Sequence, residues 1–228
     1  MERFNGDLKE AEYKFTRSNS RIFITGVPLS GKSTISPLIA RNISDCTWQN
    51  MDILRLTAQM VEEQKPIDMR SPFVNYGSCD SYHAVGDGSY SPEALIGGFK
   101  KYAEIVSDSL AFVLLKLEAQ GAKDVLFDGV QTTPEIVKRY MNDSTRLIIL
   151  TSSESRLKKN AVKMFGNEQW LLDRYSPERL MLLQSEILKQ ARDFPKDKLL
   201  IVDNSGKISG SAYKIMDYLL FSDIITRK

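Results

Sequence analysis

The chain has 228 residues, of which 42% are hydrophobic and 26% are charged, and its formal net charge is +2. This length suffices for one α/β domain with a large core, whereas the small net charge argues against a nucleic-acid-binding protein. No apolar run is long enough to span a membrane, and the first five residues do not resemble a signal peptide. The only cysteines, Cys46 and Cys79, are too far apart for a metal or redox motif. We expect a cytoplasmic enzyme with reduced thiols that does not bind membranes.

The predicted elements alternate between strand and helix. Residues 1–20 are polar and of mixed charge, which is typical of a short helix or a loose arm, and a single domain is expected over 21–228. A strand over 21–25, a helix over about 32–43, a short strand over 47–51 and a helix from 53 to about 63 follow. Residues 64–91 are irregular and rich in Gly, Ser, Asp and Tyr. Because so long a loop in a compact domain is usually functional or mobile, we expect it to border the substrate site.

The second half of the chain continues the alternation. Pro92 begins a helix that ends near Gln120, before Gly121. Short apolar strands then follow over 125–127, 146–150 and 199–202. Buried strands separated by helices indicate a parallel sheet covered on both faces. The sequence therefore predicts an α/β fold with a five-stranded parallel sheet, and the exposed face of the long helix is a candidate homodimer contact.

A glycine-rich motif joins the first strand to the first helix. It reads Gly26-Val27-Pro28-Leu29-Ser30-Gly31-Lys32-Ser33-Thr34, and its position is that of a phosphate-binding P-loop. Its glycines permit a loop whose N–H groups, with the helix N-terminus, converge on an anion. Lys32 is expected at the β- and γ-phosphates, Ser33 at Mg²⁺ and Thr34 at the α-phosphate. The motif predicts a nucleoside triphosphate and Mg²⁺ as ligands; the alternative is a glycine turn with a solvated lysine.

Two further carboxylates follow predicted strands. Asp128 ends a short apolar strand, which matches the Walker B pattern, where a carboxylate binds Mg²⁺ directly or through water. Asp52 and Arg55 come directly after the second strand and project from the same helical turn. We expect Asp52 to orient or deprotonate an attacking hydroxyl and Arg55 to bind an anionic group of the acceptor. The alternatives are a turn-forming Asp128, and an N-cap Asp52 with a solvated Arg55.

A cationic segment follows the fourth strand. Arg156, Lys159 and Lys163 share one helix face, and Arg174 and Arg179 come later. In kinases of the nucleotide- and shikimate-kinase type, a mobile lid at this place closes over the transferring phosphoryl group. We predict a helical lid over residues 153–180. The alternative is an ordinary solvated helix face.

The order of motifs supports a family resemblance. The P-loop is followed by M-D-I-L-R, C-D-S-Y, L-F-D-G-V-Q-T-T-P, R-Y-S-P-E-R and I-V-D-N. With these motifs the chain resembles the archaeal P-loop kinases related to 2-phosphoglycerate kinase and, more narrowly, the mevalonate 3-phosphate 5-kinases. The resemblance implies a nucleotide-kinase-like P-loop NTPase fold. It also assigns site residues: Asp52, Arg55, Ser81, Tyr82, Gln131, Arg174 and Arg179 for the acceptor, and Arg156 and Asn204 for the nucleotide.

The resemblance implies transfer of the γ-phosphoryl group of ATP to the 5-hydroxyl of mevalonate 3-phosphate, giving the 3,5-bisphosphate. The partner would be a small anionic phosphorylated hydroxy acid. Where 2-phosphoglycerate kinases read E-G-V-H, this chain has Asp128-Gly129-Val130-Gln131, so a neutral amide replaces an imidazole. A 2-phosphoglycerate kinase and a nucleoside or nucleotide kinase remain alternatives. A regulatory GTPase is disfavoured because the chain has Asp203-Asn204-Ser205-Gly206-Lys207 instead of an N-K-x-D motif.

Overall fold

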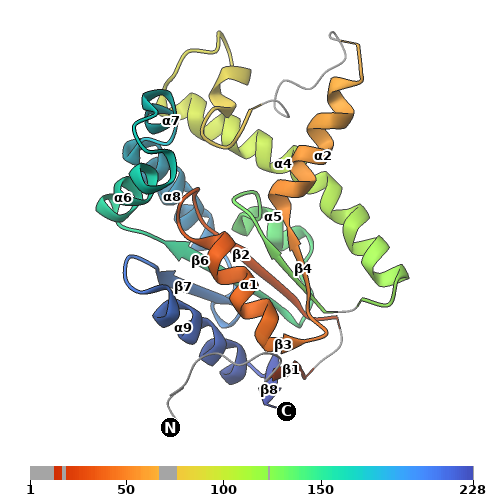
Figure 1. The fold of residues 1–228 in the computed structure, drawn as a ribbon. Coiled ribbons are helices and arrows are strands. Elements are labelled where there is room, and N and C mark those ends of the chain that lie inside the picture. The colour runs from red at the N-terminus through yellow and green to blue at the C-terminus, as the bar shows by residue number, and fades with distance from the viewer. Residues whose placement is uncertain (1–12, 17–18, 67–75, 123, 228) are drawn as a thin grey trace.

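The computed structural model describes residues 13–16, 19–66, 76–122 and 124–227. Its main sheet has the strand order β4-β5-β2-β6-β7, and all neighbouring strands are parallel (Figure 1). The strands are β2 (Arg21–Thr25), β4 (Thr47–Asn50), β5 (Val125–Asp128), β6 (Thr145–Thr151) and β7 (Leu199–Asp203). The predicted α/β fold with a five-stranded parallel sheet is confirmed.

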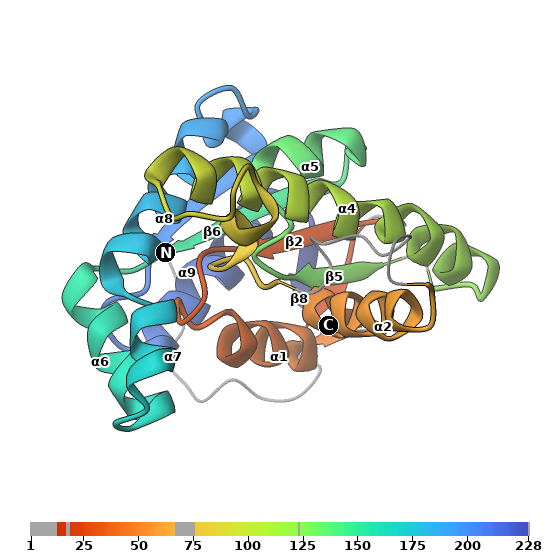
Figure 2. The ribbon, with the colours of Figure 1, turned by 90° about the horizontal axis from the view of Figure 1, so that it is seen from above.

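Helices cover both faces of this sheet. The main ones are α1 (Lys32–Asn42), α4 (Pro92–Ala119), α8 (Pro177–Ala191) and α9 (Ile208–Phe221). Side chains along β2 alternate between the two faces. Phe23 packs in the core formed with α4 and α8, whereas Ile22 and Ile24 pack in the core formed with α1 and α9. Figure 2 shows α4 along one side of the sheet and α1 along the other.

The remaining helical elements lie at the edges of this arrangement. They are α2 (Met51–Glu63), α5 (Pro134–Arg139), α6 (Glu154–Phe165), α7 (Gln169–Arg174) and two 3-10 helices, η2 (Ser81–Ala84) and η3 (Lys196–Lys198). Of the predicted irregular segment, residues 67–75 lie outside the described residues, and η2 is the regular element that the described part contains. No helix of the described chain combines the length and the apolarity that a membrane span requires.

A second, three-stranded sheet was not predicted. It has the order β3-β1-β8, with β1 (Tyr13–Phe15) parallel to β3 (Ile43–Ser44) and antiparallel to β8 (Ile225–Arg227). The expectation of a helix or a loose arm is therefore wrong for residues 13–15, and residues 1–12 and 17–18 lie outside the described chain. Tyr13 is fully buried in the core beside α1 and α9. Its apolar ring explains why this short segment is a strand and not an arm.

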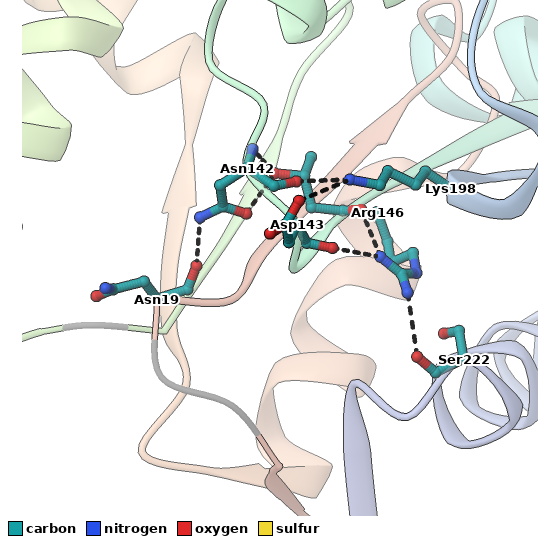
Figure 3. A network of polar contacts seen from close by, with 7 residues as sticks. Asn19, Asn142, Asp143, Arg146, Lys198 and Ser222 are labelled. Atoms are coloured by element: carbon teal, nitrogen blue, oxygen red, sulfur yellow. Dashed lines mark hydrogen bonds and ion pairs between the residues drawn. The ribbon is translucent and has the colours of Figure 1, made fainter.

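A polar network joins elements at the amino edge of the main sheet (Figure 3). The guanidinium of Arg146 donates to the main-chain oxygens of Asp143, at 3.2 Å, and Ser222, at 3.1 Å. The ammonium of Lys198 and the amide of Asn142 add bonds to the neighbouring main chain. These bonds connect the start of β6 with η3 and the end of α9. The two cations of this network thus donate to main-chain carbonyls and stabilise the fold at this edge.

Helix α4 is held against η2 by a close backbone contact. A Cβ atom added at Gly98 would lie 2.4 Å from the carbonyl oxygen of Ser81 and 2.7 Å from the main-chain nitrogen of Tyr82. The neighbouring Gly97 has open space around the same position. The contact therefore requires glycine at 98 and not at 97, and it sets the position of α4 beside the loop that contains η2.

We predict opposite effects of alanine at these two glycines. Gly98→Ala should lower the free energy of unfolding by about 1–3 kcal/mol, because the new methyl group forces backbone apart. Gly97→Ala, the matched control, should raise it by roughly 0.5–1 kcal/mol, since alanine favours a helix interior and meets no atom here. Chemical denaturation of both variants measures the difference. Equal effects of the two substitutions would show that α4 does not contact η2 in this way.

Candidate active site

The P-loop has a backbone that only glycine permits at two positions. Gly26 has φ +149°, and a Cβ atom there would lie 2.4 Å from the carbonyl oxygen of Leu150. Gly31 has φ +95°, and a Cβ atom there would lie 2.5 Å from the side-chain nitrogen of Asn204. Both conformations are strained for residues with side chains. The loop is thus fixed between the ends of β2, β6 and β7, with its last residue at the start of α1.

Lys32 is buried inside this loop. Only 8% of the residue is exposed, and its Nζ donates to the carbonyl oxygens of Gly26, at 2.8 Å, and Val27, at 2.9 Å. Burial lowers the pKa of Lys32, while the nearby carboxylates of Asp52 and Asp128 oppose that shift. An ammonium has three hydrogens, and the contacts within the described chain use two of them. The third hydrogen is available to an anion in front of the loop.

A cavity of about 500 Å³ opens in front of the P-loop. It brings together residues from the first turn of α1, the end of β4, the start of α2, the end of β5, and the segments that follow β6 and β7. The lining residues are Pro28, Leu29, Gly31, Lys32, Ser33, Thr34, Asn50, Asp52, Asp128, Arg156, Asn160, Lys163, Met164, Phe165, Tyr175, Asn204 and Ile208. All three residues predicted as catalytic, Lys32, Asp52 and Asp128, therefore meet at one cavity. Gly26 and Ser30 belong to the loop but do not line the cavity, and Ser30 is 1% exposed.

Asp128 has a partner that the sequence did not reveal. Its Oδ1 accepts a hydrogen bond of 2.7 Å from Nε1 of Trp48. Burial raises the pKa of Asp128, while Trp48 and the Lys32 ammonium oppose the shift. Trp48 is 38% exposed, and its indole N–H orients the carboxylate. The register explains the contact, because Asn50 is opposite Asp128 and Trp48 lies two residues earlier on the same face of β4.

The Asp52 carboxylate is bonded to Gln131, which is bonded in turn to Tyr102. Its Oδ1 accepts a 3.0 Å hydrogen bond from Nε2 of Gln131, and the same nitrogen lies 2.6 Å from Oη of Tyr102, on α4. Gln131 is fully buried. The contact of Gln131 with the acceptor stays a prediction: its amide hydrogens are taken by Asp52 and Tyr102, whereas within the described chain its Oε1 has no hydrogen-bond partner. Arg55 lies on the same helix as Asp52, where its guanidinium donates to the side chain of Gln59 at 3.2 Å.

The other acceptor residues suggested by resemblance lie around η2. Ser81 is fully buried and donates to the main-chain oxygen of Ser78, and its contact with the acceptor stays a prediction. Arg179 lies over the rings of Tyr82, at 5.1 Å, and Tyr90, at 4.5 Å. Arg174 is paired with the carboxylate of Asp80. Within the described chain neither arginine lines the cavity.

The segment predicted as a lid is helical and borders the cavity. Arg156 and Lys163, both on α6, line it, whereas Lys159 does not. Asn160 on the same helix donates to the main-chain oxygen of Leu29, at 2.9 Å, and so joins α6 to the P-loop. Figure 1 shows α6 and α7 beside this loop at the carboxyl edge of the sheet. Whether the two helices move as a lid stays a prediction.

The residues fit a magnesium nucleotide. Glycines 26 and 31 leave the main chain free to enclose a phosphate, and Lys32 supplies a cation with an unused hydrogen. In the described chain, Nε of Arg156 is shielded from solvent and has no hydrogen-bond partner. The buried Asp128 carboxylate would repel a polyphosphate unless a cation lay between them. Asp128 and the Ser33 hydroxyl are the oxygen ligands that Mg²⁺ prefers beside nucleotide phosphates.

Comparison with known proteins supports the fold. No protein-family profile and no curated protein matches the sequence. Among solved structures, the chain is similar to a gluconokinase from Sinorhizobium meliloti 1021, with a TM-score of 0.53 and 15% identity over 90% of this chain and 94% of that one. A sugar kinase from Janibacter sp. HTCC2649 gives a TM-score of 0.53 and 14% identity over 90% and 95%. A deoxyadenosine kinase from M. mycoides with bound dATP gives 0.51 and 18% over 88% and 99%. The protein has the fold of P-loop kinases.

We predict that Lys32→Ala lowers the affinity for a magnesium ATP analogue by about 100-fold, because a hydrogen bond to a charged partner contributes roughly 2–3 kcal/mol. Isothermal titration calorimetry measures this loss. Lys158→Ala, which removes an exposed lysine of α6 that does not line the cavity, is the matched control. An affinity of Lys32→Ala equal to that of the control would refute the assignment of this loop to phosphates.

Proposed function

We propose that the protein is an ATP-dependent kinase that phosphorylates a hydroxyl group of a small anionic metabolite. One observation carries this proposal: the Asp52 carboxylate lines the same cavity as Lys32 and Asp128. A simple nucleotide-binding protein needs the lysine and the metal carboxylate only. A third group, on a separate helix and facing both, is what transfer to a second substrate requires.

Transfer would depend mainly on position and charge. The acceptor hydroxyl would donate its hydrogen bond to Asp52, which takes the proton as the oxygen forms its bond to the γ-phosphorus and the bond to the β-phosphate oxygen breaks. Lys32 and the N–H groups of the P-loop would stabilise the charge on the phosphates. Mg²⁺, held by Ser33 and Asp128, would neutralise part of the charge on the β- and γ-phosphates. Arg156 and Lys163 would approach from α6 and help to exclude water.

We further propose mevalonate 3-phosphate as the acceptor, phosphorylated on its 5-hydroxyl. The motif order described above supports this choice. The substrate carries roughly three negative charges, one on a carboxylate and about two on a phosphate. Arg55, Arg174 and Arg179 are the candidates to bind them. Each now has an internal partner, so binding would exchange Gln59, Asp80 or an aromatic ring for a substrate oxygen.

The remaining features belong to the same proposal. A kinase of a pathway intermediate would work in the cytoplasm without nucleic acid or membrane partners. The homodimer contact on α4 stays a prediction. Two hydrophobic residues of that helix, Phe112 and Leu115, are exposed to 75% and 64%.

An acceptor screen tests the proposed function. With ATP and Mg²⁺, we expect acceptor-dependent ADP formation with mevalonate 3-phosphate and none with mevalonate, 2-phosphoglycerate or nucleosides. Phosphorus NMR of the product should show a second phosphomonoester. Turnover of 2-phosphoglycerate alone, or of a nucleoside alone, would refute mevalonate 3-phosphate as the acceptor but support the kinase activity. ATP turnover that does not depend on an acceptor would refute both proposals.

A second prediction concerns Asp52. The variant Asp52→Asn should lower kcat by about 100-fold, because general-base groups typically contribute 10²–10⁴-fold. The affinity of this variant for the magnesium ATP analogue should stay within about two-fold of wild type, because asparagine keeps the shape of the side chain even though it removes one charge. Asp108→Asn, on the exposed face of α4, is the control. Equal losses in kcat and in nucleotide affinity would place Asp52 in the nucleotide site.

A further inference from the structure

Gln131 is buried, and its amide joins two elements that are distant in the sequence. The side chain is 0% exposed, and its Nε2 lies 3.0 Å from Oδ1 of Asp52 and 2.6 Å from Oη of Tyr102. A carboxylate accepts hydrogen bonds and cannot donate one. The amide must therefore turn its NH₂ group, and not its oxygen, toward Asp52. Each of the two amide hydrogens then has one partner.

The surroundings of this amide are tightly packed. A Cβ atom at Gly129 would lie 2.5 Å from Oε1 of Gln131 and 2.6 Å from Cβ of Met51. The glycine thus leaves the room that the amide occupies, directly after Asp128 and beneath the first turn of α2. Tyr102 is 1% exposed and belongs to α4, whose position is set by the Gly98 contact with η2. The amide is consequently fixed on one side by the sheet and on the other by α4.

The bond leaves part of the Asp52 carboxylate free. Oδ1 is engaged by Gln131, whereas within the described chain Oδ2 has no hydrogen-bond partner. Asp52 itself is exposed at the cavity wall. The bond to Oδ1 fixes the orientation of the carboxylate. Oδ2 is then the oxygen that can accept a hydrogen bond from a ligand. The other charged groups near it are Lys32, Asp128 and Arg55.

We propose that Gln131 is a positioning residue that aims the Asp52 carboxylate at the acceptor hydroxyl, with Tyr102 as the anchor of its amide. This inference rests on the proposed kinase function. Gln131 acts through Asp52. A neutral amide suits this task, because a carboxylate at 131 would repel Asp52, and a charged imidazole would neutralise it.

A double-mutant cycle tests the proposal. Gln131→Leu keeps the side-chain volume and removes both donors, and we expect kcat to fall about 10- to 100-fold, because a misplacement of about 1 Å can cost that much. Affinity for the magnesium ATP analogue should not change. In the Asp52→Asn background, Gln131→Leu should change kcat by less than about two-fold. Additive losses in the cycle would overturn the proposal, since they would show that Gln131 does not act through Asp52.

Two conservative variants keep the test independent of folding defects. Tyr102→Phe should lower kcat in the same cycle by a smaller factor than Gln131→Leu. Tyr140→Phe removes a different hydroxyl bond at α4, the 3.0 Å bond to Ser107, and should leave kcat unchanged. If Tyr102→Phe and Tyr140→Phe behave alike, the anchor is refuted.

A spectroscopic readout separates this proposal from the proposed function. In protein labelled with carbon-13 aspartate, the carboxyl signal of Asp52 is assigned by its loss in Asp52→Asn. We expect that signal to move in Gln131→Leu and to stay in place in Gln190→Leu, which removes a partly buried glutamine bonded to Glu186. If the wild type phosphorylates no acceptor, the kinase proposal fails; an Asp52 signal unchanged by Gln131→Leu refutes the positioning role in either case.

Discussion

The structure depends on a buried ammonium that is held by the loop it serves. Lys32 donates to the carbonyl oxygens of Gly26 and Val27, and Gly26 and Gly31 give the loop positive-φ conformations that would be strained for any other residue. Burying a charge is unfavourable, as the lowered pKa of Lys32 shows, and the cost is offset by these bonds and by two nearby carboxylates. The site is thus charged and organised for an anion before any ligand arrives.

The parallel sheet explains why these groups meet. Every strand of the main sheet ends at the same edge, so segments that are far apart in the sequence supply one cavity. β2 gives the P-loop, β5 gives Asp128 and β4 leads into α2 with Asp52. The segment after β6 adds Arg156, and the loop after β7 adds Asn204. The opposite edge carries the main-chain bonds of Arg146 and Lys198, which stabilise the fold and leave chemistry to the other end.

The features that could be predicted from the sequence are those formed by residues that are close together in the chain. The P-loop and the strand that ends at Asp128 are contiguous patterns, and the alternation of short strand-like runs with helical segments was enough to predict the five parallel strands. The Trp48–Asp128 and Gln131–Asp52 bonds join residues about 80 positions apart, so they depend on strand register and helix placement that no local pattern encodes. The same limit explains Ser81, whose burial follows from a contact with Gly98, and β1, whose partners are β3 and β8.

The most direct test of the central claim is a crystal structure with Mg²⁺ and a non-hydrolysable ATP analogue. The account predicts that the β-phosphate lies within the loop from Gly26 to Thr34, bonded to its N–H groups, with Nζ of Lys32 turned toward the β- and γ-phosphates. A nucleotide bound elsewhere, or a Lys32 ammonium that stays on the two carbonyls with no phosphate in the loop, would contradict it.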